Sequence, residues 1–490
     1  MEPSGKSALE ALRAGAAKAT SKAATKRKSS QAAAPPAKRH SEGSSFSACP
    51  VCDRSYHTAL LPAHAASCAG AEAVQPPPKV PPPLKSQPLD GDAFAHLLAS
   101  AQLKQLQQTP SVFSLRLLSD GTVNTSWGAP GDPANAAAPT VWRERLELRD
   151  KSAPGGKVPV LLCTSVPPDA AFAWGDPHVP GEGRCRLAAG PLKSCLQKAV
   201  RRGLAKQAVR ATVALARLDA NEALRRLCVI VIEDAMLSPA LPLFTWLMAA
   251  VSKGYQPSAS LWAAVLRGVH ALAALPMRDQ PSQWAETGTL SLGSPPDGLS
   301  TLPCAQATLV RCILLRTHFG GLPGDMKMLC AAAAIWASRF AGEASPPPVP
   351  PLDWHAYVET SYGLLPRAEH CHGTDDSQAE AQLANIQPLR ARDVPPAAID
   401  FHCSNIVNDV MADKGFSPAM LDALGSLGEP TEVLKRAMWR FRSGISLKEV
   451  MAGMDDDGED SDALRTAWRS VAPLVEQHAA RLIRRGFAHG

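Results

Sequence analysis

Four side chains of the kinds that zinc prefers lie close together near the start of the chain. Cys49 and Cys52 are separated by two residues, and His64 and Cys68 are four residues apart. A C-x-x-C turn presents two sulfurs from one knuckle, and two residues four apart on a helix face the same way. The pattern predicts one Zn²⁺ held by Cys49, Cys52, His64 and Cys68. Because the protein supplies all four ligands, we expect a structural ion and not a catalytic one.

The segment around these ligands has few residues that could form an apolar core. Leu60–Cys68 has the length of a short helix, and Phe46 and Tyr56 are the large apolar side chains nearby. A module of this size cannot fold on its own core, so the metal must supply the folding free energy. We therefore expect a zinc-dependent module over residues 47–70.

The motif C-P-V-C-x11-H-x3-C resembles the UBZ4-type zinc finger, a ubiquitin-binding module of DNA-damage proteins. The resemblance implies a small ββα zinc finger whose partner is ubiquitin or a ubiquitinated protein. In that family the helix carries an acidic residue two positions after the zinc histidine, and here that position is Ala66. Reading of DNA bases by the finger is not expected, because residues 60–63 (Leu-Leu-Pro-Ala) offer no side chain that contacts bases.

The positive charge of the chain is concentrated before the finger. Residues 1–48 contain nine Lys and Arg against three Asp and Glu, a surplus of six that equals the net charge of +6 of the whole chain. We expect residues 1–46 to form a disordered basic tail. Two basic pairs, Lys26-Arg27 and Lys38-Arg39, resemble a bipartite nuclear import signal and predict a nuclear protein. The alternative is a solvated tail that carries no targeting signal.

A second basic segment lies in the middle of the chain. Residues 193–226 contain nine Lys and Arg against two Asp and Glu, at helical spacing. Concentrated positive charge favours contact with a phosphate backbone, because binding releases counterions. The predicted nucleic-acid contacts are Lys198, Arg201, Arg202, Lys206 and Arg210. The alternative is that these residues form ordinary solvated faces of amphipathic helices.

The same segment carries a second resemblance. Leu192–Gly203 and Arg225–Asp234 are similar to the helical segment after the ATPase in the MgsA and Werner-helicase-interacting-protein family. That family also carries a UBZ4-type finger in eukaryotes. The G-x-x-x-x-G-K-[ST] phosphate loop is absent from this chain, so we expect no nucleotide. We interpret Val229–Ile232 as a buried helix that ends in two carboxylates, not as a Walker B strand.

Two further clusters contain possible metal ligands. One consists of His370, Cys371 and His372, and the other of Asp400, His402 and Cys403. The ligand types suit zinc or iron, but neither spacing forces convergence on one ion. We expect a loop and a structural cysteine here. A metal-dependent enzyme that uses the finger for targeting is the alternative.

Composition shifts divide the chain into seven parts. A Pro-rich linker over 71–89 follows the finger, and a second Pro-rich linker spans 344–352. A β-rich region is expected over 90–185, where Val112–Leu118 and Val123–Trp127 predict a hairpin. Helical spacing predicts a helical domain with the basic segment over 186–343 and a helical C-terminal region over 353–490. The chain is thus expected to be multidomain, with a finger on a disordered arm and a mainly helical α+β body.

Several functional classes are excluded. The apolar stretches are too short to cross a membrane, and the common hydrolase, metalloprotease and dinucleotide motifs are absent. The remaining features predict a non-enzymatic nuclear adaptor of the DNA-damage response. Its finger would bind ubiquitin or a ubiquitinated partner, and its body would bind DNA or a repair partner, with the linker raising their effective concentration. A plain DNA-binding protein, with salt-sensitive binding through Arg201, Arg202 and Arg210, is a further alternative.

Overall fold

The computed structural model describes two compact units. The described residues are 46–48, 55–57, 110–118, 121–128, 140–172, 174, 184–279, 290–342, 376–448 and 461–488. The first two ranges belong to one unit, and all ranges from 110 onward belong to the other, here called the body. Most of the predicted basic tail and both predicted Pro-rich linkers, 71–89 and 344–352, lie outside the described residues.

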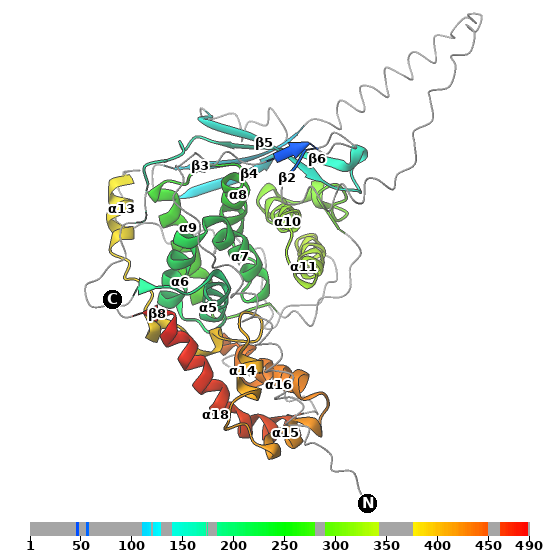
Figure 1. Cartoon of the computed structure of the whole chain (residues 1–490). Helices are drawn as coiled ribbons and strands as arrows, with labels where there is room; N and C mark the ends of the chain where they lie inside the picture. The colour runs from blue at the N-terminus through cyan, green and yellow to red at the C-terminus, as the bar shows by residue number, and fades with distance from the viewer. Residues whose placement is uncertain are drawn as a thin grey trace, which may run out of the picture. The chain divides into compact units, whose positions relative to one another are not determined.

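The body contains a four-stranded mixed sheet with the order β4-β3-β6-β5 (Figure 1). Its strands are β3 (Ser111–Leu117), β4 (Val123–Gly128), β5 (Trp142–Arg149) and β6 (Lys157–Thr164). β3 and β4 form the hairpin that the sequence predicts, with Phe113 opposite Trp127 and Gly121 at a positive φ of 75° in the turn. β3 pairs in parallel with β6, and β6 pairs antiparallel with the edge strand β5.

Strand composition follows position in the sheet. In β5 the exposed Arg145, Glu147 and Arg149 alternate with the buried Leu146 and Leu148, so this end of the strand has a charged outer face. β3 lies in the middle of the sheet, and its Phe113 and Leu115 are completely buried. An edge strand is expected to have one solvated face, as β5 has, and a central strand is expected to be more apolar, as β3 is.

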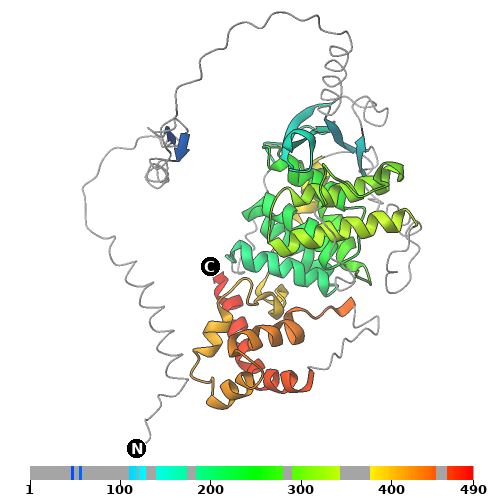
Figure 2. The ribbon, with the colours of Figure 1, turned by 90° about the vertical axis from the view of Figure 1, so that its right-hand side faces the viewer.

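Helices form the bulk of the body and lie against the sheet (Figures 1 and 2). They are α5 (Ala189–Arg201), α6 (Ala205–Leu218), α7 (Ala220–Glu233), α8 (Leu241–Val251), α9 (Ala259–Ala274), α10 (Cys304–Thr317) and α11 (Pro323–Phe340). Every residue of α8 is buried except the last one, Val251, and the helix contacts β3 and β4. The indole Nε1 of Trp246 on α8 donates to the carbonyl oxygen of Phe113 at 2.9 Å. This bond links the helical layer to the central strand β3.

The C-terminal residues form a second group of helices within the body. They are α13 (Asp376–Ala384), α14 (Ile406–Met411), α15 (Pro418–Gly425), α16 (Pro430–Met438) and α18 (Ser461–Arg485), with a π-helical turn η6 (Trp439–Ser443) after α16. Short 3-10 helices are η1 (Pro154–Gly156), η3 (Leu299–Thr301), η4 (Ala391–Asp393) and η5 (Pro396–Ala398). Strand β7 (Arg184–Cys185), just before α5, pairs antiparallel with β8 (Phe487–Ala488), just after α18.

These elements confirm the predicted α+β class of a mainly helical body. The interpretation of Val229–Ile232 is also confirmed, because these residues are buried in α7 and Asp234 caps that helix. The stretch is therefore not a nucleotide-binding strand. Among the described helices, none is long and apolar enough to cross a membrane.

Asp150 ties the end of β5 to a loop that is distant in sequence. Its carboxylate accepts hydrogen bonds from the Gly293 N–H at 2.8 Å and from the Ser152 hydroxyl at 2.6 Å, and Ser152 also bonds Ser291 at 2.7 Å. A Cβ at Gly293 would lie 2.7 Å from the Cβ of Ala153, so this close approach requires glycine. Burial raises the pKa of Asp150, but the hydrogen bonds from Ser152 and Gly293 outweigh it and hold the pKa at about 2.

We expect Asp150→Asn to lower the free energy of unfolding by about 2 kcal/mol at pH 7. The folded pKa of Asp150 lies below its ordinary value of 3.8, so its contribution is present above that value and is lost as the pH falls toward 2. Urea unfolding at pH 7 and pH 3 tests this. A difference between the variant and the native protein that is as large at pH 3 as at pH 7 would contradict it.

Candidate functional site

The predicted zinc site falls in the smaller unit, where the structure describes two short strands (Figure 2). β1 (Phe46–Ala48) pairs antiparallel with β2 (Ser55–His57), with Phe46 opposite His57 and Ala48 opposite Ser55. The link between the two strands is residues 49–54, which include Cys49 and Cys52. The helix expected over 60–68 lies outside the described residues, so the UBZ4-type finger stays a prediction.

Several predicted site residues lie outside the described residues. They are the four zinc ligands Cys49, Cys52, His64 and Cys68, the import residues Lys26, Arg27, Lys38 and Arg39, and His370, Cys371 and His372 of the first C-terminal cluster. Their roles stay predictions. The donor set of three thiols and one imidazole is a standard set for structural Zn²⁺.

Arg201, one of the predicted nucleic-acid contacts, lies inside the body. Its side chain is 2% exposed, and its guanidinium forms an ion pair with Asp234, whose side chain is fully buried. It also donates to the carbonyl oxygen of Ser443 at 2.8 Å and lies 3.4 Å from a carboxylate oxygen of Glu233. Burial raises the pKa of Asp234, but the charge of Arg201 outweighs it and lowers that pKa, so the pair is ionised at neutral pH.

Arg202, the next residue, connects α5 to the C-terminal helices. It donates to the carbonyl oxygen of Arg442 at 2.7 Å. Arg442 is itself buried, forms an ion pair with Glu476 at 2.6 Å, and donates to the carbonyl oxygens of Ile399 and Pro396. Two adjacent arginines at the end of α5 therefore hold the turn η6 in place.

The other three predicted contacts differ in exposure. The Lys198 ammonium lies 3.3 Å from the Asp400 carboxylate, and both side chains are buried. Arg210 is half-buried and donates to Asp393 at 2.8 Å, whereas Lys206 is exposed. Of the five predicted residues, the surface thus presents Lys206, with Arg202 and Arg210 partly accessible. Contact with nucleic acid stays a prediction that rests on this smaller set.

The second C-terminal cluster is organised around Asp400. Its carboxylate pairs with Lys198 and accepts a hydrogen bond from the backbone N–H of His402 at 2.9 Å. Burial raises the pKa of Asp400, but His402 and Lys198 outweigh it and hold the pKa at about 2. Burial and the Asp400 charge raise the pKa of the Cys403 thiol to about 11, so it is protonated at neutral pH. Among the described residues, no three His, Cys, Asp or Glu side chains are grouped as metal ligands.

Trp439 covers this charged interior. Its ring centre lies 5.4 Å from the Lys198 ammonium and 5.0 Å from the Arg201 guanidinium, within the range of cation–π attraction. Trp439 is 40% exposed as a residue, and its ring and the His402 ring meet edge to face with 6.0 Å between centroids. Trp439 begins the π-helical turn, a feature that is frequent at sites under functional or packing constraint.

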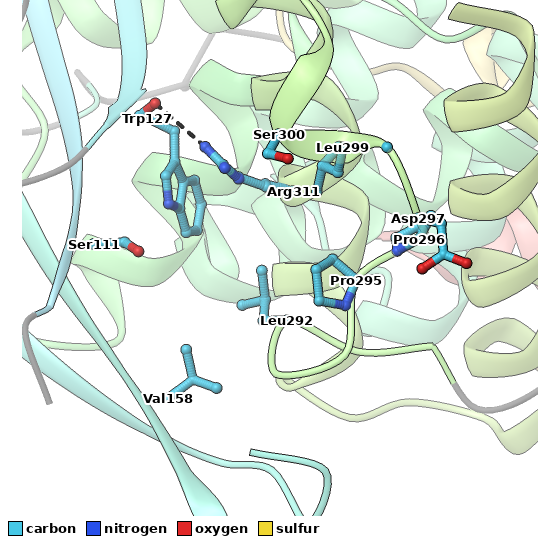
Figure 3. A pocket seen from close by; sticks show the side chains of 11 residues that line it. Ser111, Trp127, Val158, Leu292, Pro295, Pro296, Asp297, Leu299, Ser300 and Arg311 are labelled. Atoms are coloured by element: carbon cyan, nitrogen blue, oxygen red, sulfur yellow. Dashed lines mark hydrogen bonds between the residues drawn. The ribbon is translucent and has the colours of Figure 1, made fainter. Parts of the chain in front are cut away.

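The sequence analysis missed a cavity of about 440 Å³ at the sheet (Figure 3). Its lining comes from β3, β4 and β6, from residues 292–300 and from Arg311 on α10. No motif could have indicated it, because these segments are far apart in the chain. The one local signal is Arg311, a charged residue within an otherwise apolar helical run.

The chain matches no protein-family model, no curated protein and no solved structure. The functional argument therefore depends on the residues of this chain and on the contacts that they make.

We expect the buried Arg201–Asp234 pair to be strongly coupled. Arg201→Met or Asp234→Leu alone leaves an uncompensated buried charge and should lower the free energy of unfolding by about 3–5 kcal/mol. The double variant removes both charges and should lose much less than the sum. Urea unfolding of the four proteins measures this coupling energy.

The exposed pair Arg145–Glu147 on β5 serves as the matched control, because its side chains are 52% and 41% exposed. Its disruption by Arg145→Met should cost less than about 1 kcal/mol. Equal losses at the two pairs, or strictly additive losses at Arg201 and Asp234, would disprove the coupling.

Proposed function

We propose that the protein is a non-enzymatic, zinc-binding nuclear adaptor of the DNA-damage response. The observation that carries this proposal is the C-P-V-C-x11-H-x3-C motif, together with the strand pairing of β1 and β2 on either side of Cys49 and Cys52. A finger of this kind gives the chain a recognition module, and the body supplies a second binding surface.

Three thiolates and one imidazole would hold the zinc, with Cys49 and Cys52 supplied from the link between the strands. The ion would fix the strands against the segment that carries His64 and Cys68. Because no ligand position stays open to water, the ion would organise a binding surface and would not activate a substrate.

Ubiquitin, free or conjugated to a partner, is the proposed ligand of the finger. The support is the resemblance to the UBZ4-type module. Ala66 stands where that family has an acidic residue, so the contact surface would rely on shape and apolar side chains such as Leu60 and Leu61. A small apolar contact of this kind gives weak binding, which a tethered second site strengthens.

The contacts of the body weaken the case for DNA as its ligand. Inside the body Lys198 pairs with Asp400 and Arg201 pairs with Asp234, so these two cations do not face a phosphate backbone. The proposed partner of the body is therefore a repair protein, while the finger holds ubiquitin. DNA binding would have to rely on the accessible Lys206 and on residues beyond the predicted set.

We expect the purified full-length protein to contain one Zn²⁺ per chain. Cys49→Ser should abolish zinc binding, because it removes one of the four ligands, and should leave the unfolding temperature of the body unchanged, because the site lies in the other compact unit. Elemental analysis and thermal unfolding measure the two quantities. Cys304→Ser is the control, since Cys304 is an exposed free cysteine in the body.

A metal-free native protein would remove the basis of the proposal. A second metal equivalent that survives Cys49→Ser would instead support the enzyme alternative, with a metal centre in the C-terminal clusters.

We expect the full-length protein to shift a defined set of resonances of ¹⁵N-labelled ubiquitin. The shifts should disappear in Cys49→Ser and persist in Cys304→Ser, because only the first substitution unfolds the finger. Absence of shifts at millimolar concentrations of the zinc-loaded protein would refute ubiquitin as the ligand. It would not contradict the zinc site, which the metal analysis tests separately.

A further inference from the structure

The cavity at the sheet has walls from three parts of the body (Figure 3). Ser111, Trp127 and Val158 line it from β3, β4 and β6, respectively. Leu292 and the residues up to Ser300 form a second wall, and Arg311 on α10 forms the third. Its volume of about 440 Å³ lies within the range of sites that hold small organic molecules.

Arg311 brings a positive charge into this cavity, and no acidic side chain among the described residues forms an ion pair with it. Its side chain is half-buried, and within the described part of the body it makes one weak hydrogen bond, to the carbonyl oxygen of Trp127 at 3.5 Å. Burial lowers the pKa of Arg311, although the guanidinium stays charged at neutral pH. By contrast, the buried Arg339 forms two hydrogen bonds to Asp279. A half-buried cation without a carboxylate is the group that an anionic ligand satisfies.

The second wall is held in place before any ligand binds. Asp150 accepts a hydrogen bond from the backbone N–H of Gly293, and Ser152 bonds Ser291, so both sides of the lining residue Leu292 are tied to β5 and the turn after it. Leu299 at the other end of this wall is 4% exposed and anchors the 3-10 helix η3 in the core. A preformed cavity spares a ligand much of the entropy cost of ordering its site.

We propose that this cavity binds a small organic acid that has one carboxylate and a compact apolar group. The carboxylate accepts hydrogen bonds from the Arg311 guanidinium, and the apolar group packs against Trp127, Leu292 and Val158. The inference is independent of the proposed finger, because the cavity lies wholly in the body.

The charges of the lining favour a carboxylate over a phosphate ester. Among the described residues that line the cavity, Arg311 is the single cation, so it balances one negative charge. Asp297 also lines the cavity, is exposed, and makes no ion pair with Arg311 (Figure 3). Its carboxylate repels a second negative charge on the ligand. A monoanion with an apolar body therefore fits better than a dianion.

The test uses the full-length native protein with phenylbutyrate as the probe and phenylbutyramide as its neutral analogue. Titration calorimetry should give binding of the acid at least about tenfold tighter than binding of the amide, because only the acid pairs with Arg311. 3-Phenylpropyl phosphate, which has the same apolar group as phenylbutyrate and is a dianion at pH 8, should bind more weakly than phenylbutyrate at that pH.

Arg311→Gln should weaken binding of the acid by about tenfold and leave binding of the amide unchanged. Arg436→Gln is the matched control, because Arg436 is an exposed arginine on α16 and does not line the cavity. Arg311→Lys keeps the charge and loses the fork geometry, so it should fall between the native protein and Arg311→Gln.

Equal affinity for acid and amide, unchanged acid binding in Arg311→Gln, or no binding of either probe at millimolar concentration would each overturn the proposal. The comparison of acid with amide needs only the native protein, so it remains decisive if a variant fails to fold. Cys49→Ser should leave acid binding unchanged, because the cavity lies in the body. Failure of the proposed zinc finger would therefore not affect the result for the cavity.

Discussion

The organisation of the body depends on charges that are buried and paired at one junction. Arg201 at the end of α5 pairs with Asp234 at the end of α7 and donates to Ser443, which is 242 residues away in sequence. The desolvation of these groups is tolerable only because each finds its partner, so an alternative arrangement of the two helical groups would leave charges without compensation. The junction thus selects one arrangement of the C-terminal helices.

The sequence predicts the local elements well and the environment of their charges poorly. The alternation around Gly121 gives the hairpin, and the apolar spacing gives α5 to α9, because these signals lie within a few turns of the chain. Lys198 and Arg201 have the same helical spacing whether they face solvent or a carboxylate. The partners that make these two side chains buried ion pairs, Asp400 and Asp234, are distant in sequence. For the same reason, the parallel pairing of β3 with β6 could not be predicted from either strand alone.

The two candidate sites differ in how a sequence reveals them. The zinc motif is compact, because four ligands must converge within a short segment, and its spacing is a strong signal. The cavity at Arg311 is made by residues from β3 to α10, and its chemistry follows from which charges lack a partner after folding. Such a property belongs to the folded body and has no motif.

The pairing of β7 with β8 has a consequence for how the body folds. Arg184 lies opposite Ala488, so this short ladder closes a loop that contains every α-helix described in the body. Closing so long a loop costs entropy that a two-residue ladder cannot recover alone, so we expect α18 to dock before the strands join. A ribosome-bound chain that has emerged only as far as α11 would lack this closure. Until α18 emerges and docks, the helices already formed would expose apolar surface that chaperones can bind.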